Sequence, residues 1–98
     1  MKTNFFYTYL LLSQKDKKFY SGYTVDMENR LKEHKAGKVF STKNRLPVDL
    51  VYCEACLDEE DAKQREKYLK SGKGKKYIKS RIRRFLKRSG FGPITGTP

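Results

Sequence analysis

The chain has 98 residues, of which 37% are hydrophobic, 13% aromatic and 35% charged. This length suits one hydrophobic core, and the aromatic content argues against a chain too polar to fold. No apolar run approaches the roughly 20 residues that a membrane span requires. The N-terminus has neither a sustained apolar region nor a small-residue cleavage site. We therefore expect a cytoplasmic protein rather than a secreted or membrane-spanning one.

The net charge of +12 is concentrated in one part of the chain. Residues 63–88 contain thirteen Lys or Arg and one acidic residue, Glu66, whereas the rest of the chain has ten basic and ten acidic residues. This asymmetry indicates a polyanionic partner. Nucleic acid is the leading candidate, because each Lys or Arg that neutralises a phosphate releases counterions. Anionic lipid is the second candidate, and a basic surface that serves only solubility is the third.

The first element expected in chain order is a β-hairpin. Residues 5–12 are rich in aromatic and branched side chains, residues 13–18 are polar, and residues 19–23 are again aromatic. Aromatic runs of this length separated by a short polar segment are typical of paired strands.

A helix is expected directly after this hairpin. Thr24 or Asp26 can cap its N-terminus, and Gly37 can end it. Three residues recur at helical spacing and would form its inward face: Met27, Leu31 and His34. A loop over residues 38–47 follows, and then a third strand over residues 49–56.

The rest of the chain predicts helices. The acidic residues 58–61 suit the N-terminus of a second helix, which would run to Ser71 and end at Gly72. A last, basic helix over residues 76–88 would bury four apolar residues, Ile78, Ile82, Phe85 and Leu86. Residues 90–98 are rich in Gly and Pro and are expected to form a disordered tail. The expected fold class is α/β (α+β), a three-stranded, mainly antiparallel sheet flanked by helices in a single domain over residues 1–89.

Cys53 and Cys56 form a C-x-x-C pattern inside the third expected strand. A zinc site needs four ligands, and His34 is the only other soft candidate. We therefore expect two ordinary buried thiols rather than a metal site or a redox pair.

One carboxylate occupies an unusual position on the second helix. Helical spacing puts Glu66 on the same stripe as Ala62 and Leu69, which should enter the core. An ionised carboxylate there needs either a Lys or Arg to neutralise it or a divalent cation to coordinate, and the spacing leaves both open. Arg30 and His34 border the apolar stripe of the first helix, where a structural role is the commoner outcome.

The hairpin adds several tyrosines, of which Tyr9 and Tyr20 are examples, and aromatic strand residues usually belong to the core. Together with Glu66 and Arg30, however, they offer what phosphodiester hydrolysis requires. These requirements are a cation at the phosphate, a positive group for the developing charge, and a group that accepts a proton from water. Arg30 suits the second role, because a guanidinium stays charged and its fork matches phosphate oxygens.

The same residues resemble the motifs of the GIY-YIG nuclease domain family. The resemblance spans residues 5–79 and rests on Tyr7-Thr8-Tyr9, Tyr20-Ser21-Gly22, Arg30 and Glu66 in that order. Small, free-standing bacterial members are the most similar. The resemblance implies the order strand, strand, helix, strand, helix.

The resemblance also implies roles for individual residues. Tyr20, alone or with Tyr9, would orient or deprotonate the attacking water, and Arg30 would stabilise the phosphorane-like transition state. Glu66 would hold a single Mg²⁺ or Mn²⁺ ion. His34 stands where family members carry a Tyr or His that assists the site.

Some positions depart from the family pattern. Tyr7 replaces the usual Gly, and Ser21 replaces the usual Ile. Tyr23, which we include among the candidate catalytic residues, stands where a Lys is often found. No Asn follows Glu66, although some members place one near the site. These departures bear on turnover and substrate choice rather than on the fold.

The sequence thus predicts a divalent-metal-dependent endonuclease that hydrolyses DNA, with RNA left open as a substrate and with repair or recombination as the expected setting. The alternative is a nucleic-acid-binding module of the same fold that does not cut. Neither a membrane nor a small-molecule cofactor is expected. The Gly-rich residues 70–76 are either a phosphate-backbone contact or a plain linker. Nine basic residues are expected to contact the backbone: Lys43, Arg45, Lys70, Lys73, Lys75, Lys76, Lys79, Arg83 and Arg84.

Overall fold

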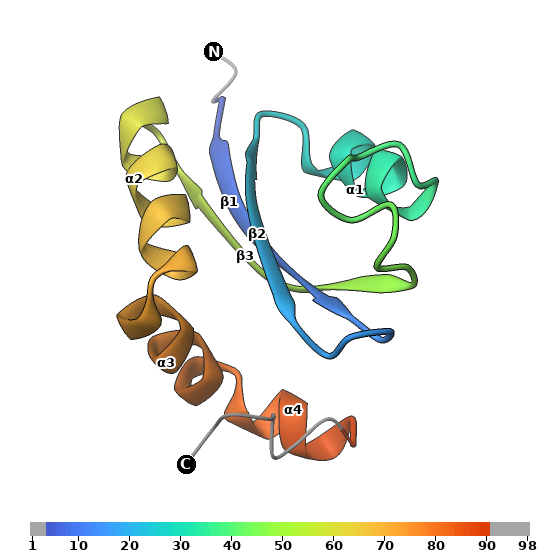
Figure 1. The fold of residues 1–98 in the computed structure, drawn as a ribbon. Coiled ribbons are helices and arrows are strands. Elements are labelled where there is room, and N and C mark those ends of the chain that lie inside the picture. Colours follow the sequence, from blue (N-terminus) through green and yellow to red (C-terminus); the bar gives the residue numbers. More distant parts are fainter. Residues whose placement is uncertain (1–3, 91–98) are drawn as a thin grey trace.

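The computed structural model of the chain describes residues 4–90. Its elements are β1 (Phe6–Ser13), β2 (Phe19–Thr24), α1 (Met27–Lys35), β3 (Val48–Cys56), α2 (Glu59–Lys70), α3 (Gly72–Arg81) and α4 (Arg83–Arg88). The strands form one antiparallel sheet in the order β2-β1-β3. α1 lies on one side of this sheet, and α2 and α3 lie on the other (Figure 1). The predicted fold class is confirmed.

The central strand β1 organises the core. Its side chains alternate, so Tyr9 and Leu11 pack on the α1 side with Leu31, whereas Leu10 packs on the opposite side with Leu69. A strand covered on both faces carries a continuous apolar run, and this explains residues 9–12. None of the helices in the described part of the chain is long and apolar enough to cross a bilayer.

The first helix follows its sequence signals closely. Asp26 is the N-cap and accepts a hydrogen bond from the backbone N–H of Asn29. Gly37, just beyond the C-cap, has a φ of 75°, which glycine adopts readily and other residues rarely do. Of the two predicted capping residues, Asp26 is therefore the one used.

The prediction that the two cysteines are buried is wrong. Cys53 is exposed and Cys56 is half-buried, and both are free thiols. β3 is an edge strand, so its side chains have a neighbouring strand on one side only. Within residues 4–90, no three His, Cys, Asp or Glu side chains gather as a metal cluster.

α2 ends at Lys70 with Ser71 as its C-cap, close to the predicted end at Ser71. Of the two alternatives for the Gly-rich residues 70–76, the plain linker is wrong, because Gly72 is the first residue of α3. Ser71 separates the two helices and caps both of them. Its hydroxyl donates to the carbonyl oxygen of Tyr68 at 2.6 Å and accepts from the N–H of Gly74 at 3.1 Å. The Gly-rich segment is therefore the first turn of a helix, because the serine cap is strong enough to start one there.

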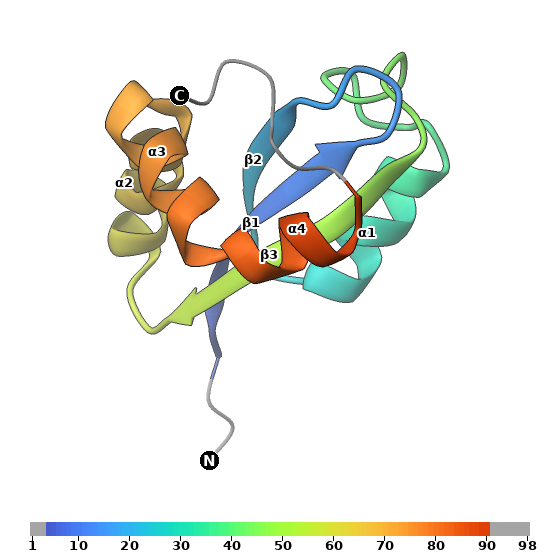
Figure 2. The ribbon, with the colours of Figure 1, turned by 90° about the horizontal axis from the view of Figure 1, so that it is seen from below.

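The single basic helix predicted over residues 76–88 is in fact two helices, α3 and α4. Ile82 separates them, with φ −111° and ψ 26°. Ile82 and Leu86 pack against Leu12, whereas Ile78 packs with Leu10 and Leu69. Figure 2 shows that α4 runs in a different direction from α3. Apart from Gly90, the predicted disordered tail over residues 90–98 lies outside the described residues.

The α2–α3 junction supplies a test of the fold. A Cβ at Gly74 would overlap the carbonyl oxygen of Tyr68, whereas a Cβ at Gly72 would meet nothing within 4 Å. Gly74→Ala should therefore destabilise the protein by about 1–3 kcal/mol. Gly72→Ala, the matched control in the same helix, should change the stability by less than about 1 kcal/mol. Urea unfolding midpoints measure both, and equal midpoints for the two variants would contradict the packing described here.

Candidate active site

A hollow of about 240 Å³ lies beside the edge strand β2, and we call it the reaction hollow. Its lining residues come from β1, β2, α1, the following loop and α2: Tyr9, Tyr20, Ser21, Gly22, Tyr23, Arg30, His34, Ser41, Glu66 and Lys70. Every residue predicted to be catalytic, and the predicted metal ligand Glu66, therefore lies at one place.

The two sides of this hollow belong to opposite faces of the sheet. Tyr9 packs on the α1 face, whereas Glu66 comes from α2 on the other face. Gly22 lies opposite Tyr9 in the strand register, and a Cβ at Gly22 would overlap the Tyr9 phenol. The absence of a side chain at this position lets the phenol lie over β2 and reach the edge of the sheet.

Tyr9 and His34 are the buried centre of the site, with exposed fractions of 2% and 3%. The Tyr9 hydroxyl lies 2.7 Å from His34 Nε2 and accepts from Arg30 Nε at 3.4 Å. Because Arg30 can only donate, the Tyr9 proton is free to point at His34. His34 Nδ1 lies 2.7 Å from Thr42 Oγ1. In the Nδ1–H tautomer, His34 donates to Thr42 and its Nε2 is a proton acceptor for the phenol.

The environment keeps both members of this pair neutral. Burial, and then the charge of Arg30, lower the pKa of His34 below its usual value of 6.5. Burial raises the pKa of Tyr9, and the nearby Arg30 offsets part of that rise. At neutral pH, His34 is thus an uncharged acceptor facing a protonated phenol.

Arg30 is held at the reaction hollow from two directions. Its NH1 group donates to Glu33 Oε1 at 3.1 Å, and its Nε donates to Tyr9. The hydrogen bond to Tyr9, followed by the bond to Glu33, raises the pKa of the guanidinium. Arg30 therefore remains positive over the whole working pH range.

Tyr20 and Tyr23 line the same hollow, but their hydroxyls are bound to carboxylates. Tyr20 donates to Asp16 Oδ2, and Tyr23 donates to Glu59 Oε2 at 2.5 Å. Burial and then Asp16 raise the pKa of Tyr20, and the hydrogen bond to Glu59 raises the pKa of Tyr23 to about 12. Neither phenol is ionised more readily than an ordinary tyrosine.

Glu66 is the only carboxylate that lines the reaction hollow. Its Oε2 lies 3.2 Å from Lys70 Nζ, and the two side chains are 22% and 61% exposed. Glu66 thus has the lysine partner that one of the two alternatives required, and it also lines the reaction hollow. Mg²⁺ keeps several waters and commonly uses one or two carboxylates together with phosphate oxygens. This donor set suits one loosely held ion that the substrate completes, not a preformed cage.

The partners of these residues were not found from the sequence. Thr42, Asp16 and Glu59 lie 8, 4 and 36 residues from the side chains that they bind. Asp16 sits in a polar turn and Thr42 in a polar loop, where no periodic pattern marks a single residue. The acidic cluster over residues 58–61 placed Glu59 at a helix start, but it gave no sign of a contact with Tyr23.

The nine predicted nucleic-acid contacts are spread over three regions. Lys43 and Arg45 lie in the loop after α1, where Lys43 stacks over Phe40 and Arg45 pairs with Asp16 at 3.5 Å. Lys70 lines the reaction hollow. The others follow α3 and α4, namely Lys73, Lys75, Lys76, Lys79, Arg83 and Arg84.

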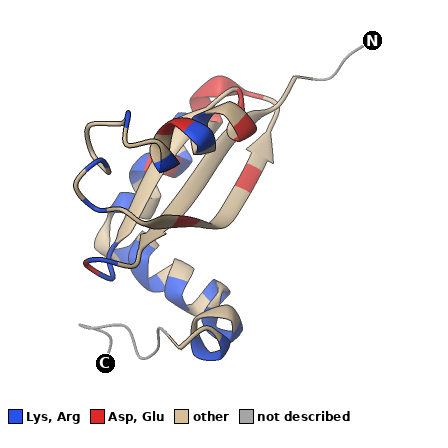
Figure 3. Cartoon of the chain, turned by 90° about the vertical axis from the view of Figure 1, so that its right-hand side faces the viewer, with Lys and Arg blue, Asp and Glu red and all other residues tan. Residues whose placement is uncertain are grey.

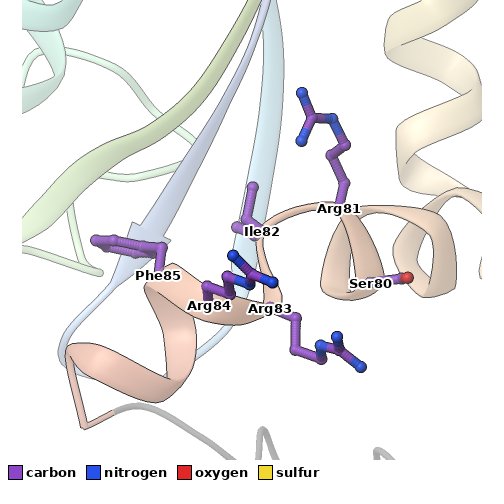
Figure 4. Close-up of a pocket in the computed structure, with 6 residues that line it drawn as sticks. All are labelled: Ser80, Arg81, Ile82, Arg83, Arg84 and Phe85. Atoms are coloured by element: carbon purple, nitrogen blue, oxygen red, sulfur yellow. The ribbon is translucent and has the colours of Figure 1, made fainter.

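The arm formed by α3 and α4 carries uncompensated positive charge. Residues 67–98 contain no Asp or Glu, and no Lys or Arg of α3 or α4 forms an ion pair in the described part of the chain (Figure 3). At the joint between the helices, Arg81, Arg83 and Arg84 line a hollow of about 460 Å³. Arg81 and Arg83 point in opposite directions there, while Ile82 and Phe85 point towards the strands (Figure 4). Arg81 was not among the predicted contacts.

Comparisons with known proteins agree with this geometry. The family model described as the GIY-YIG catalytic domain matches residues 5–79. A UPF0213 protein of Bacillus licheniformis is 44% identical over 87 residues, which cover 85% of this chain and 89% of the relative. The UPF0213 protein YazA of Bacillus subtilis is 41% identical over 73 residues, 71% of either chain. A UPF0213 protein of Natronomonas pharaonis is 42% identical over 66 residues, 66% of this chain and 76% of the relative. No solved structure matches.

His34 is the only histidine in the chain, so its titration can be followed directly by NMR. We expect its pKa to lie below 6.5 in the wild type. Arg30→Gln should raise this pKa, because it removes a nearby positive charge that disfavours the imidazolium. Lys32→Gln, on the exposed side of the same helix, is the control and should leave it unchanged. A wild-type pKa at or above 6.5 would contradict the buried, Arg30-facing position.

Proposed function

We propose that this chain, which belongs to the GIY-YIG family of nucleases, is a DNA endonuclease that hydrolyses phosphodiester bonds with one divalent cation. Members of this family act on nucleic acids and generally use divalent metals. The cation would be Mg²⁺ or Mn²⁺. DNA repair or recombination as the setting, and the cytoplasm as the location, belong to the same proposal and rest on the family and the sequence alone.

The observation that carries the proposal is the convergence of Glu66, Arg30 and Tyr9 in the reaction hollow. These residues are up to 57 positions apart in the chain and come from both faces of the sheet. A purely structural Glu66 would need only Lys70, its neighbour on the same helix. Its position across from a guanidinium and a phenol provides what hydrolysis of a phosphodiester needs.

We assign the Tyr9–His34 pair as the group that accepts a proton from the attacking water. The Tyr9 oxygen would take the proton from water while Tyr9 passes its own proton to His34 Nε2, 2.7 Å away. This transfer leaves His34 as the imidazolium and Tyr9 neutral, so no free phenolate with a raised pKa is required. Tyr20 would orient the water or the phosphate, since its hydroxyl proton is directed to Asp16.

The remaining groups would stabilise negative charge. Arg30 is fixed by Tyr9 and Glu33 and would donate to the phosphate oxygens as charge develops on them. Glu66 would hold the divalent cation, which supplies Lewis-acid charge at the phosphate. Tyr23 would form part of the wall, because its hydroxyl is bound to Glu59.

The α3–α4 arm would supply affinity without sequence information. Its cations have no carboxylate partners in the described residues, so they are available for backbone phosphates. Contacts of this kind position the nucleic acid but do not read bases. The proposal therefore includes weak sequence preference and strong salt dependence.

The first test compares divalent-dependent plasmid nicking by the wild type, Glu66→Gln and Arg30→Gln. Each variant should lower the rate by about 10²–10³, because each removes charge stabilisation of the transition state. Glu60→Gln on the same helix is the matched control and should cut like the wild type, because Glu60 is exposed and forms no ion pair with any of the residues 4–90.

The same experiment separates the two candidate functions. A wild type that binds DNA but shows no nicking with Mg²⁺ or Mn²⁺ would sink the nuclease proposal and favour the non-cutting binding module. Equal nicking by Glu66→Gln and the wild type would remove Glu66 from the chemistry.

A second test displaces Tyr9 without removing any polar group. Gly22→Ala places a Cβ where the Tyr9 phenol lies, so the phenol must move away from His34. We expect nicking to fall by at least about 10²-fold, since small misplacements at a reacting centre are costly. The DNA affinity should stay within about twofold, and circular dichroism should confirm folding. Retained nicking would show that the Tyr9–His34 contact is not needed.

A further inference from the structure

We propose that a second hollow, adjoining the reaction hollow, receives the base of an unpaired nucleotide next to the phosphate that is cut. The preferred substrates would then be gapped, flapped or single-stranded DNA rather than intact duplex. This inference rests on the proposed nuclease function and specifies its substrate class.

The second hollow has a volume of about 270 Å³ and shares one wall with the reaction hollow. Four residues line both spaces: Tyr20, Ser21, Ser41 and Lys70. Because the two spaces are contiguous, a strand whose phosphate lies in the first would bring a neighbouring nucleoside to the second.

The two hollows differ in polarity, as the phosphate and the base of a nucleotide do. The reaction hollow is lined mainly by polar atoms, as a phosphate requires, and the second hollow mainly by apolar ones. Leu10 and Leu69, which are 1% and 2% exposed, lie beside Phe19 in its lining. Nucleobases present flat apolar faces that pack on aromatic and aliphatic side chains.

Ser21 lines both hollows and carries an unused polar group. Its hydroxyl is buried and has no hydrogen-bond partner within the described residues. A buried hydroxyl without a partner is unfavourable, so a ligand that offers a donor or acceptor would be favoured there. The edge of a base offers both.

Lys75 lies in the lining of the second hollow and has no ion pair among the described residues. Lys70 lines both hollows. Positive charge beside an apolar pocket suits a nucleoside that is followed by its own phosphate. The site therefore matches a nucleotide as a whole, with apolar packing for the base and cations for the backbone.

A paired base cannot occupy this space. In a duplex its faces are stacked and its edge is bonded to the partner base, so entry requires the nucleotide to be unpaired or extruded. Nucleotides that are already unpaired avoid this cost, and this is the physical source of the expected preference for gaps, flaps and single strands.

The test uses flap duplexes in which the cut position has been mapped. Each nucleotide flanking the cut is then replaced in turn by an abasic analogue, which keeps the backbone and removes the base. We expect one abasic position to lower kcat/KM by about tenfold, consistent with the loss of one packed base. A fully paired duplex of the same sequence should be cut more slowly than the flap. No effect at either flanking position, or equal cutting of flap and duplex, would overturn the proposal.

Two variants at one position probe the serine hydroxyl. Ser21→Thr and Ser21→Val have nearly the same shape, but only threonine keeps the hydroxyl. For each variant, kcat/KM for the intact flap is divided by kcat/KM for the abasic flap. This ratio should stay closer to the wild-type ratio in Ser21→Thr than in Ser21→Val. Equal ratios in these two variants would remove Ser21 from base recognition and overturn that part of the inference.

Binding measured in EDTA distinguishes this inference from the proposed function. Fluorescence anisotropy of the wild type should show weaker binding to the abasic flap than to the intact flap, whether or not the protein cuts. If nothing is cut but this difference is found, the nuclease proposal fails and the base pocket stands. If cutting is found but intact and abasic flaps bind and react equally, the base pocket fails and the nuclease proposal stands.

Discussion

The close contact between the Tyr9 phenol and Gly22 determines where the site can form. Tyr9 belongs to the central strand, whose side chains are normally confined to the core. Because β2 has no side chain opposite it, the phenol lies across the edge strand and its hydroxyl reaches Arg30 and His34. The same edge is where α2, on the other face, presents Glu66. One missing Cβ thus allows groups from two faces of the sheet to share a hollow.

The two motif tyrosines have opposite kinds of partner, and the partners separate their roles. Tyr9 lies 2.7 Å from Nε2 of an imidazole that burial and Arg30 keep neutral by lowering its pKa, so this nitrogen is a proton acceptor for the phenol. Tyr20 faces the carboxylate of Asp16, which fixes the direction of its hydroxyl and raises its pKa. The hydrogen bonds therefore favour Tyr9 for proton transfer and Tyr20 for orientation, although the two phenols line the same space.

The charges on α1 and α2 are arranged differently from those on α3 and α4. In α1 and α2, lysines and arginines pair with acids one turn away, as in the exposed Lys32–Glu28 pair, and such pairs are worth only about 0.2–0.5 kcal/mol. In α3 and α4 the described cations have no acidic partners and form a surface for polyanions. Glu66 lies where the two regions meet. Its half-exposed pair with Lys70 is of the weak kind, so a cation or a phosphate can compete for either partner.

The sequence by itself determined the order of the three strands and the first two helices, two candidate caps for α1, the stop at Gly37 and the odd position of Glu66 on an apolar stripe. These features are local, because helical period, capping and turn preference act over a few residues. It did not determine the break at Ile82, because the helical spacing of Ile78, Ile82 and Leu86 continues across it. Only the tertiary structure decided the partners of the site residues and the second hollow. Strand order and register bring together side chains 25 or more residues apart, and no short-range pattern encodes which of them will meet.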